Sequence, residues 1–354
     1  MKAFRIALYP GDGIGPEVVA EAVRVLERVQ AQDGGFRLAL THLPWGADYY
    51  FQHGQVAPDD FLDQLRGFDA ILLGAVGDPQ RLPDHVTLAP LVRIRQSFDQ
   101  YACLRPCRQF SGVPSLLRHN HPIDLLILRE NSEGEYVVCG GRVRPGQAEE
   151  VAVQSAIHTW RGVERILRFG FQLARTRRHR LSMITKSNAL RYGFVLWDEV
   201  LEKLRREFPD VETDRQHADA AAMDFVRRPQ RFDVVVASNL FGDILSDLGA
   251  AIIGGLGLAP SANINPERTA PSMFEPVHGS APDIAGKGIA NPVAMILSSA
   301  MMLEWLELQN AADAIRSATE AALAGGAKTP DLGGTLTAAG MTDEIIKHLE
   351  TTER

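Results

Sequence analysis

Two aspartates with the spacing of metal ligands, Asp243 and Asp247, stand four residues apart in the segment Ser238-Asn-Leu-Phe-Gly-Asp-Ile-Leu-Ser-Asp-Leu248. On a helix this spacing puts both carboxylates on one face, about 5 to 6 Å apart, where they repel each other unless a cation lies between them. Carboxylate oxygens suit Mg2+ or Mn2+. The neighbouring side chains are apolar and no Lys or Arg is interleaved. The segment therefore favours a metal site over a solvated acidic helix face.

Three arginines, Arg95, Arg105 and Arg129, are suited to anion binding, since a guanidinium group can bind a carboxylate through two parallel hydrogen bonds. They follow a helical pattern, precede Pro106 and end an apolar run, respectively. Three of them near strand ends would suit a small dicarboxylate, although scattered arginines are more often surface ion-pair partners. Arg129 opens a polar stretch that ends at Tyr136, which brings a hydroxyl group near the same strand end.

A glycine-rich turn, Gly11-Asp-Gly-Ile-Gly15, follows an apolar run and precedes a helical pattern, as a dinucleotide fingerprint does. Its third glycine comes one residue too early for GxGxxG, the spacing that lets the helix pack closely on the strand. A Walker loop, GxxxxGK[ST], is absent from the sequence. The turn therefore does not indicate a Rossmann site, and the chain lacks the usual cradle for phosphoryl transfer.

Short apolar runs that alternate with helical patterns must position these residues. Runs of this kind, typical of buried strands, lie at 4–9, 36–43, 70–73, 125–128 and 234–237. Apolar residues recur at helical spacing in the segments 16–29, 160–175, 194–208, 292–307 and 311–323. This alternation predicts an α/β fold.

Length and charge narrow the function classes. The chain has 354 residues, 45% of them hydrophobic, which predicts a folded protein long enough for two domains. Its 37 Lys and Arg against 44 Asp and Glu give a net charge of −7. No basic excess is left for a phosphate backbone, so nucleic acid is not an expected partner.

The distribution of apolar residues and cysteines predicts a cytoplasmic protein. The run at 4–9 stops at Pro10, too early for a signal peptide. The most apolar later stretch, 293–303, is far shorter than the roughly 18 residues that span a bilayer, and we expect a buried helix there. Three cysteines are too few for a disulfide framework. We interpret them as buried thiols in a reducing compartment: Cys103, Cys107 and Cys139.

Five motifs in order resemble the β-decarboxylating dehydrogenases, the family of isocitrate and 3-isopropylmalate dehydrogenases. They are Gly11-Asp-Gly-Ile-Gly-Pro16, Arg129-Glu-Asn-Ser-Glu-Gly-Glu-Tyr136, Thr185-Lys-Ser-Asn188, Asn239-Leu-Phe-Gly-Asp-Ile-Leu-Ser-Asp247 and the stretch from His278 to Pro292. Within that family, the segments 83–88, 98–101, 232–238 and 259–268 are most similar to D-malate and tartrate dehydrogenases.

The resemblance implies a two-domain, non-Rossmann α/β fold like that of isopropylmalate dehydrogenase, with the active site in the cleft between the domains. Residues 1–102 and 255–354 would form a larger, discontinuous, cofactor-binding domain. Residues 103–254 would form a smaller domain for substrate, metal and dimerisation. The family also implies a homodimer whose active sites share residues across the subunits.

The resemblance assigns the reaction to individual residues. Lys186 would be the general base for the substrate hydroxyl, a role that requires a lysine whose pKa burial or a neighbouring cation has lowered. Tyr136 would protonate the enolate left after CO2 departs. Mn2+ or Mg2+ would be held by Asp219, Asp243 and Asp247, and would polarise the new carbonyl.

Binding of substrate and cofactor is implied in the same way. Arg95, Arg105 and Arg129 would hold the carboxylates, with Leu91 facing the substituent on carbon 3. The cofactor would be held by Ile14, Asn188, His278, Gly279, Ser280, Ala281, Asp283 and Asn291. Asp283 and Ile284 stand where an NADP enzyme of the family would carry basic and aromatic residues, so we expect NAD.

Substrate choice depends on the segment Leu88-Ala-Pro-Leu-Val-Arg-Ile-Arg95, which departs from the D-malate and tartrate pattern because Ala89-Pro90 replaces a Trp-Gly pair and the stretch is one residue shorter. We expect D-malate first and tartrate next, with 3-isopropylmalate as the alternative. A catalytically idle regulatory paralogue is a remote alternative, because none of the expected metal, base or arginine residues is missing. A non-enzymatic binding module would leave Lys186, Tyr136 and the arginines without a role.

Overall fold

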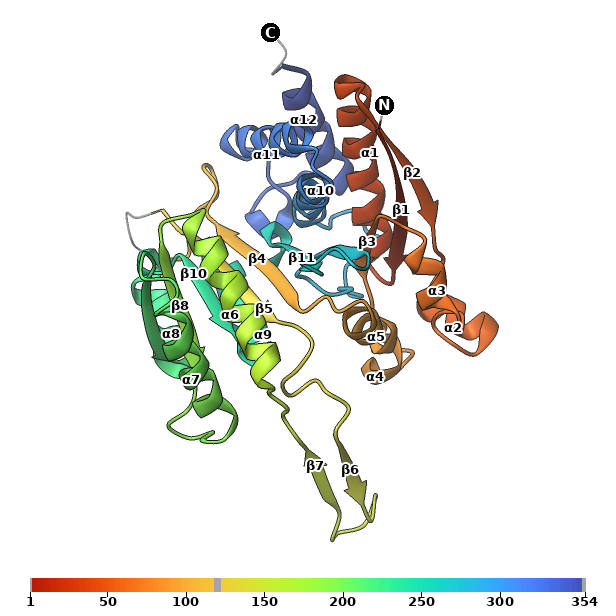
Figure 1. The fold of residues 1–354 in the computed structure, drawn as a ribbon. Coiled ribbons are helices and arrows are strands. Elements are labelled where there is room, and N and C mark those ends of the chain that lie inside the picture. The colour runs from red at the N-terminus through yellow and green to blue at the C-terminus, as the bar shows by residue number, and fades with distance from the viewer. Residues whose placement is uncertain (1, 118–121, 352–354) are drawn as a thin grey trace.

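The computed structural model, which describes residues 2–117 and 122–351, is built on a ten-stranded sheet (Figure 1). The order across the sheet is β2 (Phe36–His42), β1 (Lys2–Gly11), β3 (Ala70–Ala75), β12 (Ser272–Pro276), β11 (Pro260–Ile264), β4 (Ala102–Arg108), β5 (Asp124–Glu130), β10 (Val234–Ala237), β8 (Arg180–Thr185) and β9 (Glu212–His217). The strands are parallel on both flanks and antiparallel from β12 to β5. The predicted α/β fold is confirmed, and all five predicted strands are present.

The two ends of the chain lie side by side over one flank of the sheet. The helices there are α1 (Gly15–Asp33), α10 (Val293–Trp305), α11 (Gln309–Ala324) and α12 (Ala338–Thr351). Ion pairs join α1 to α12, from Arg24 to Asp343 at 2.5 Å and from Arg28 to Glu350 at 2.8 Å. Helix α10 is buried along most of its length, as its apolar sequence predicted.

The middle of the chain forms the other flank. Its helices are α6 (Trp160–Arg175), α7 (Gly193–Leu204), α8 (Ala218–Arg227) and α9 (Asn239–Ile253). Helix α6 begins where the Thr159 hydroxyl accepts a hydrogen bond from the Gly162 amide at 3.0 Å, a capping contact that satisfies one free donor of the first turn. The division into domains at 102/103 and 254/255 stays a prediction. These boundaries fall inside β4 and just after α9, and residues 1 and 352–354 lie outside the described part.

Shorter elements complete the two flanks. The helices are α2 (Ala47–His53), α3 (Phe61–Arg66), α4 (Asp84–Thr87) and α5 (Ala89–Ser97), and the 3-10 turns are η1 (Pro229–Arg231), η2 (Leu256–Leu258) and η3 (Pro330–Leu332). No helix of the described residues is long and apolar enough to cross a membrane.

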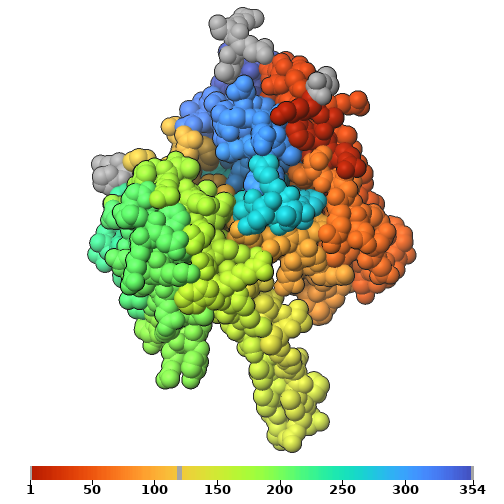
Figure 2. All heavy atoms as spheres, in the orientation of Figure 1, coloured from red at the N-terminus to blue at the C-terminus, as the bar shows by residue number. Residues whose placement is uncertain are grey.

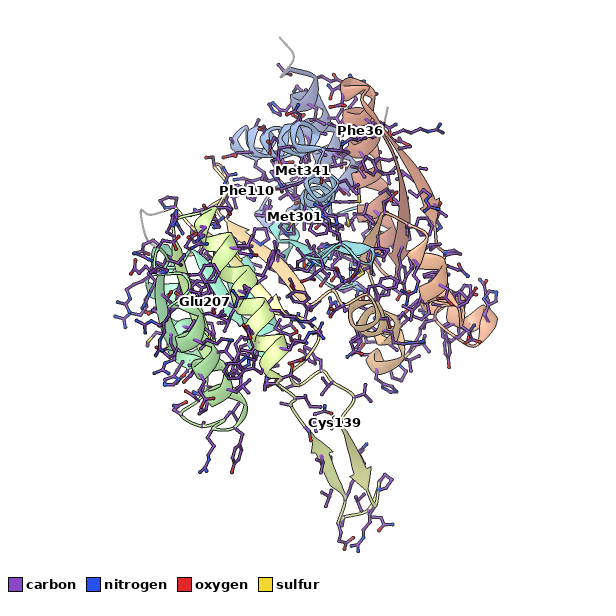
Figure 3. The ribbon with its side chains drawn as sticks, in the orientation of Figure 1. Phe36, Phe110, Cys139, Glu207, Met301 and Met341 are labelled. Atoms are coloured by element: carbon purple, nitrogen blue, oxygen red, sulfur yellow. The ribbon has the colours of Figure 1, made fainter. Side chains whose placement is uncertain are left out.

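A two-stranded arm made of β6 (Gly140–Val143) and β7 (Val151–Gln154) stands away from the body of the molecule (Figures 1 and 2). Valines along it are exposed, with Val138 at 98% and Val143 at 60%. Cys139 lies at the base of this arm (Figure 3) and is exposed, so the prediction of three buried thiols is wrong for this residue. The prediction failed because the arm does not pack on the core, whereas Cys103 and Cys107 are buried in β4.

Candidate active site

A cavity of about 310 Å³ opens beside the carboxyl end of β3, and α5, β4, β5, β12 and α9 contribute to its wall. Charged and polar side chains from distant parts of the chain meet there: Arg95, Arg105, Arg129, Tyr136, Asp243, Glu275 and His278. Its apolar wall includes Val76, Leu88, Leu91 and Val92. The structure therefore brings together all three predicted arginines, the predicted tyrosine and Leu91 around a space that is large enough for a small diacid.

Asp243 is the centre of the hydrogen bonds in this cavity. Its Oδ1 accepts from Nη1 of Arg105 at 3.0 Å and from Nη1 of Arg129, while its Oδ2 accepts from the Tyr136 hydroxyl at 3.0 Å. The Arg129 guanidinium also lies over the Tyr136 ring, 5.4 Å from its centroid, and donates from Nε to Asn239 Oδ1 at 2.8 Å. No Lys or Arg lies near Asp243 in the sequence, but the folded chain brings two guanidinium groups to it, those of Arg105 and Arg129.

Burial and charge shift the titration of these groups. Burial alone would raise the pKa of Asp243, but the charges of Arg129 and then Arg105 outweigh it, and that pKa is lowered. Burial, followed by the Asp243 charge, raises the pKa of Tyr136 above its ordinary value. Burial, with the nearby Arg105 charge, lowers the pKa of Arg129 to about 10. At neutral pH the site therefore holds an ionised carboxylate beside a protonated phenol that can act as a hydrogen donor.

Lys186 and Asp219 are not among the residues that line this cavity. They are bonded to each other instead, with Nζ of Lys186 2.8 Å from Oδ1 of Asp219, and the Asp219 side chain is 71% exposed. Asp247 lies one turn beyond Asp243 on α9 and, unlike Asp243, is not among the residues that line the cavity. Across residues 2–117 and 122–351, no three His, Cys, Asp or Glu side chains come close enough together to hold a metal ion.

The donor set fits a divalent cation in its chemistry, because Asp243 and Asp247 offer only hard oxygen ligands on one helix. It falls short in number, because the third predicted ligand, Asp219, is bonded to Lys186 away from the cavity. Asp243 and Asp247 alone therefore do not make a set of three ligands among the described residues.

The glycine-rich turn after β1 docks against the loop that follows β12. The Ile14 amide donates to Ser280 O at 2.8 Å. A Cβ on Gly13, where φ is +60°, would lie 2.0 Å from that same oxygen, so only glycine permits this approach. Asp12 secures the turn by accepting from the amides of Ala47 at 2.7 Å and Gly77 at 2.8 Å. The turn thus supports the neighbouring loop through its backbone.

The predicted cofactor residues lie in different surroundings. His278 and Gly279 line the cavity, and Nε2 of His278 is buried without a hydrogen-bond partner, which fits a ligand that offers one. Asp283 is exposed on the same loop. Asn291 is bonded within the protein, accepting from Val293 N at 3.0 Å and donating to Asp331 at 3.0 Å. Asn188 is exposed and does not line the cavity.

Glu275 is a cavity residue that the sequence prediction missed. Its carboxylate accepts from Nη2 of Arg95 at 2.6 Å, and both side chains are mostly buried. The available signal was a single acidic residue inside the buried segment Ser272–Pro276, just before the predicted cofactor loop. Such an isolated charge in an apolar strand indicates a partner of opposite sign.

Comparison with known proteins identifies the family to which the chain belongs. A model of the family "Isocitrate/isopropylmalate dehydrogenase" matches residues 5–349, and the chain belongs to this family. It is therefore an oxidoreductase, in agreement with the prediction from its motifs.

Relatives with specific names cover nearly the whole chain. The D-malate dehydrogenase [decarboxylating] of Escherichia coli is 51% identical over 98% of this chain and 99% of its own length. A probable tartrate dehydrogenase/decarboxylase of Bacillus subtilis is 46% identical over 99% of both chains. Among solved structures, isocitrate dehydrogenase from Methylococcus capsulatus matches with a TM-score of 0.89 and 37% identity, over 98% of this chain and 99% of that one. The match confirms the predicted fold.

Proposed function

We propose that this enzyme oxidises and decarboxylates a small 2-hydroxy diacid with NAD and Mn2+ or Mg2+, and that D-malate, converted to pyruvate and CO2, is its main substrate. The observation that carries the proposal is the meeting of Arg95, Arg105 and Arg129 around one cavity of about 310 Å³. Three guanidinium groups there match the two carboxylates of a diacid. The names of the relatives from Escherichia coli and Bacillus subtilis support D-malate, with tartrate second.

The chemistry proceeds in two steps. In the oxidation, Lys186 would take the proton of the hydroxyl group on carbon 2, and bound NAD would supply the oxidant that accepts the hydride of carbon 2, so that the product is a β-keto acid. In the decarboxylation, the bond between carbon 3 and the adjacent carboxylate breaks, CO2 leaves, and its electron pair becomes an enolate. Tyr136 then returns a proton to carbon 3. The protonated state of its phenol, favoured by the raised pKa, is the state that this role requires.

The residues around the cavity would hold the two absent groups. Asp243 and Asp247, with Asp219, would bind the divalent cation, which as a Lewis acid stabilises negative charge on the substrate oxygen. His278, Asp283 and their loop would bind NAD. Arg105 and Arg129 both bond to Asp243, so a cation held by Asp243 would free these guanidinium groups to bind a diacid.

We propose a homodimer in which Lys186 and Asp219 of one subunit complete the cavity of the other. Two observations support it: the Lys186 and Asp219 pair does not line the cavity of its own chain, and the arm exposes apolar side chains. An isolated two-stranded hairpin is marginally stable in water, so pairing with a second arm would stabilise it.

One observation favours a second candidate, 3-isopropylmalate. The wall beside Arg95 is apolar, with Leu88, Leu91 and Val92 facing the cavity, as the isopropyl group of that substrate would require. A few buried methyl groups contribute only about 1 to 3 kcal/mol, so this wall accepts an isopropyl group without requiring one.

The test is a product balance. The purified enzyme with D-malate, NAD and Mn2+ should yield NADH, pyruvate and CO2 in equal amounts. NADH without CO2 would show a simple dehydrogenase. No NADH from D-malate, tartrate or 3-isopropylmalate would indicate the idle paralogue.

A further inference from the structure

A closed ring of hydrogen bonds joins five residues through their side chains and through backbone groups of two of them: Arg95, Gln100, Asn131, Asn263 and Glu275. Arg95 Nη2 and Asn263 Nδ2 both donate to Oε1 of Glu275, each at 2.6 Å. Asn131 Nδ2 donates to Asn263 Oδ1 at 2.9 Å and to the backbone oxygen of Gln100 at 3.2 Å. The Gln100 amide closes the ring by donating to the backbone oxygen of Arg95 at 2.8 Å.

The ring crosses the antiparallel centre of the sheet. Arg95 lies in the last turn of α5, Asn263 on β11 and Glu275 on β12, and Asn131 directly follows β5. Asn263 and Gln100 have no exposed surface, and Asn131 is 4% exposed. Arg129, two residues before Asn131, is on the same strand end. The ring therefore joins the elements that carry the first and third arginines of the cavity.

Each bond in the ring fixes the orientation of the next side chain. Asn263 can donate to Glu275 only if its amide nitrogen faces the carboxylate, and its oxygen then faces Asn131. Asn131 must present its nitrogen to that oxygen. A buried carboxylate held by one charged and one neutral donor has little freedom to turn, and it directs the Arg95 fork toward the cavity.

We propose that Asn131 and Asn263 are positioning residues for substrate binding. Through Glu275 they hold the Arg95 guanidinium at a fixed separation from Arg129, so that the two arginines together select a diacid. This inference deepens the proposed function and rests on it. A purely structural ring would stabilise the fold without affecting how tightly the diacid binds, and the two roles predict different kinetics.

The experiment uses Asn263→Ala and Asn131→Ala, with Asn131→Ser as a milder variant if the first two do not fold. The substrate is whichever of D-malate, tartrate and 3-isopropylmalate the unmodified enzyme uses most efficiently. We expect KM for the diacid to rise roughly tenfold or more, because the variants would disturb only the arginine that binds the diacid. The value of kcat should change less, and KM for NAD should stay within about twofold of that of the unmodified enzyme. Thr319→Val, which removes a buried hydroxyl bonded to Ile315 O in α11, is the control and should lower Tm alone.

A double-mutant cycle tests whether the effect passes through Arg95. In an Arg95→Lys background, Asn263→Ala should add less than about twofold to KM for the diacid, since the group it positions is gone. Folded variants whose KM for the diacid stays within twofold of the unmodified enzyme, or effects that multiply in the cycle, would overturn the positioning role and leave the proposed function intact. Failure of the unmodified enzyme to oxidise any of the three diacids would overturn both.

Discussion

Nη1 of Arg105 lies 3.0 Å from Oδ1 of Asp243, so a side chain assigned to the substrate is bonded directly to one assigned to the metal. The two charges neutralise each other, and the Arg105 side chain is 7% exposed whereas that of Asp243 is 34% exposed. Under the proposed function, a diacid would replace Asp243 as the partner of Arg105, and a divalent cation would replace Arg105 as the partner of Asp243. Metal and substrate are therefore expected to bind cooperatively, each releasing the group that the other needs.

The metal assignment is tested by Asp243→Asn. The amide cannot supply an anionic ligand, so kcat/KM should fall by about 100-fold or more. Tm should fall as well, because the buried Arg105 and Arg129 lose the charge of their carboxylate partner. EDTA should lower kcat/KM of the unmodified enzyme to a similar extent, and added Mn2+ should restore it. Asp313→Asn, which changes an exposed aspartate paired with Arg316 on α11, is the matched control. A chelated enzyme that keeps most of its activity would disprove the Lewis-acid role.

Tyr136→Phe removes the hydroxyl that donates to Asp243 and keeps the ring under Arg129. Because the proton is needed only after the keto acid exists, conversion of added oxaloacetate to pyruvate should slow by about 100-fold or more, while reduction of NAD is affected less. Rapid mixing that follows NADH and pyruvate separately distinguishes the two steps. Equal losses in both would argue against a separate acid.

Mixing two inactive variants tests whether subunits share their active sites. Measured as formation of pyruvate from D-malate, Lys186→Ala and Tyr136→Phe dimers should each be nearly inactive. In a hybrid dimer, one cavity would combine an intact Tyr136 with the intact Lys186 of the partner subunit. Random exchange of subunits should then restore roughly a quarter of the unmodified activity, because half of the dimers are hybrids with one working site. A mixture that stays inactive after verified subunit exchange would contradict sharing.

Strands β1, β2, β3, β5 and β10 could be predicted from the sequence because they contain short, continuous apolar runs. Strands β8 and β9 of one parallel flank were missed, and β9 has no apolar run at all. In the antiparallel centre, β4, β11 and β12 were missed as well. Strands β4, β11 and β12 carry Arg105, Asn263 and Glu275, and these polar residues interrupt the apolar pattern. They are tolerated there because they bond to one another and to the site, which only the folded structure reveals.

The sequence predicted which residues belong to the site, but it did not predict the contacts among them. The motifs contained Asp243, Tyr136 and the arginines, whereas the bonds among them join residues more than 100 positions apart. The exposure of Cys139 was unpredictable for the same reason, since it depends on an arm that leaves the core. Local sequence patterns carry no information about such distant packing.

Cofactor choice is tested at Asp283, whose exposed carboxylate can accept from ribose hydroxyls and repels a 2′-phosphate. NAD should be preferred over NADP by at least about tenfold in kcat/KM, equivalent to about 1.4 kcal/mol. Asp283→Asn should narrow that preference by improving the use of NADP. Equal efficiency with the two cofactors in the unmodified enzyme would refute the assignment.

The most direct test of the proposed function is kcat/KM for D-malate, tartrate and 3-isopropylmalate, measured side by side with the same NAD and Mn2+ concentrations. The cavity arginines and the relatives predict the highest value for D-malate, with tartrate second and each turnover releasing CO2. A higher value for 3-isopropylmalate would contradict the substrate assignment and show that the apolar wall formed by Leu88, Leu91 and Val92 determines specificity.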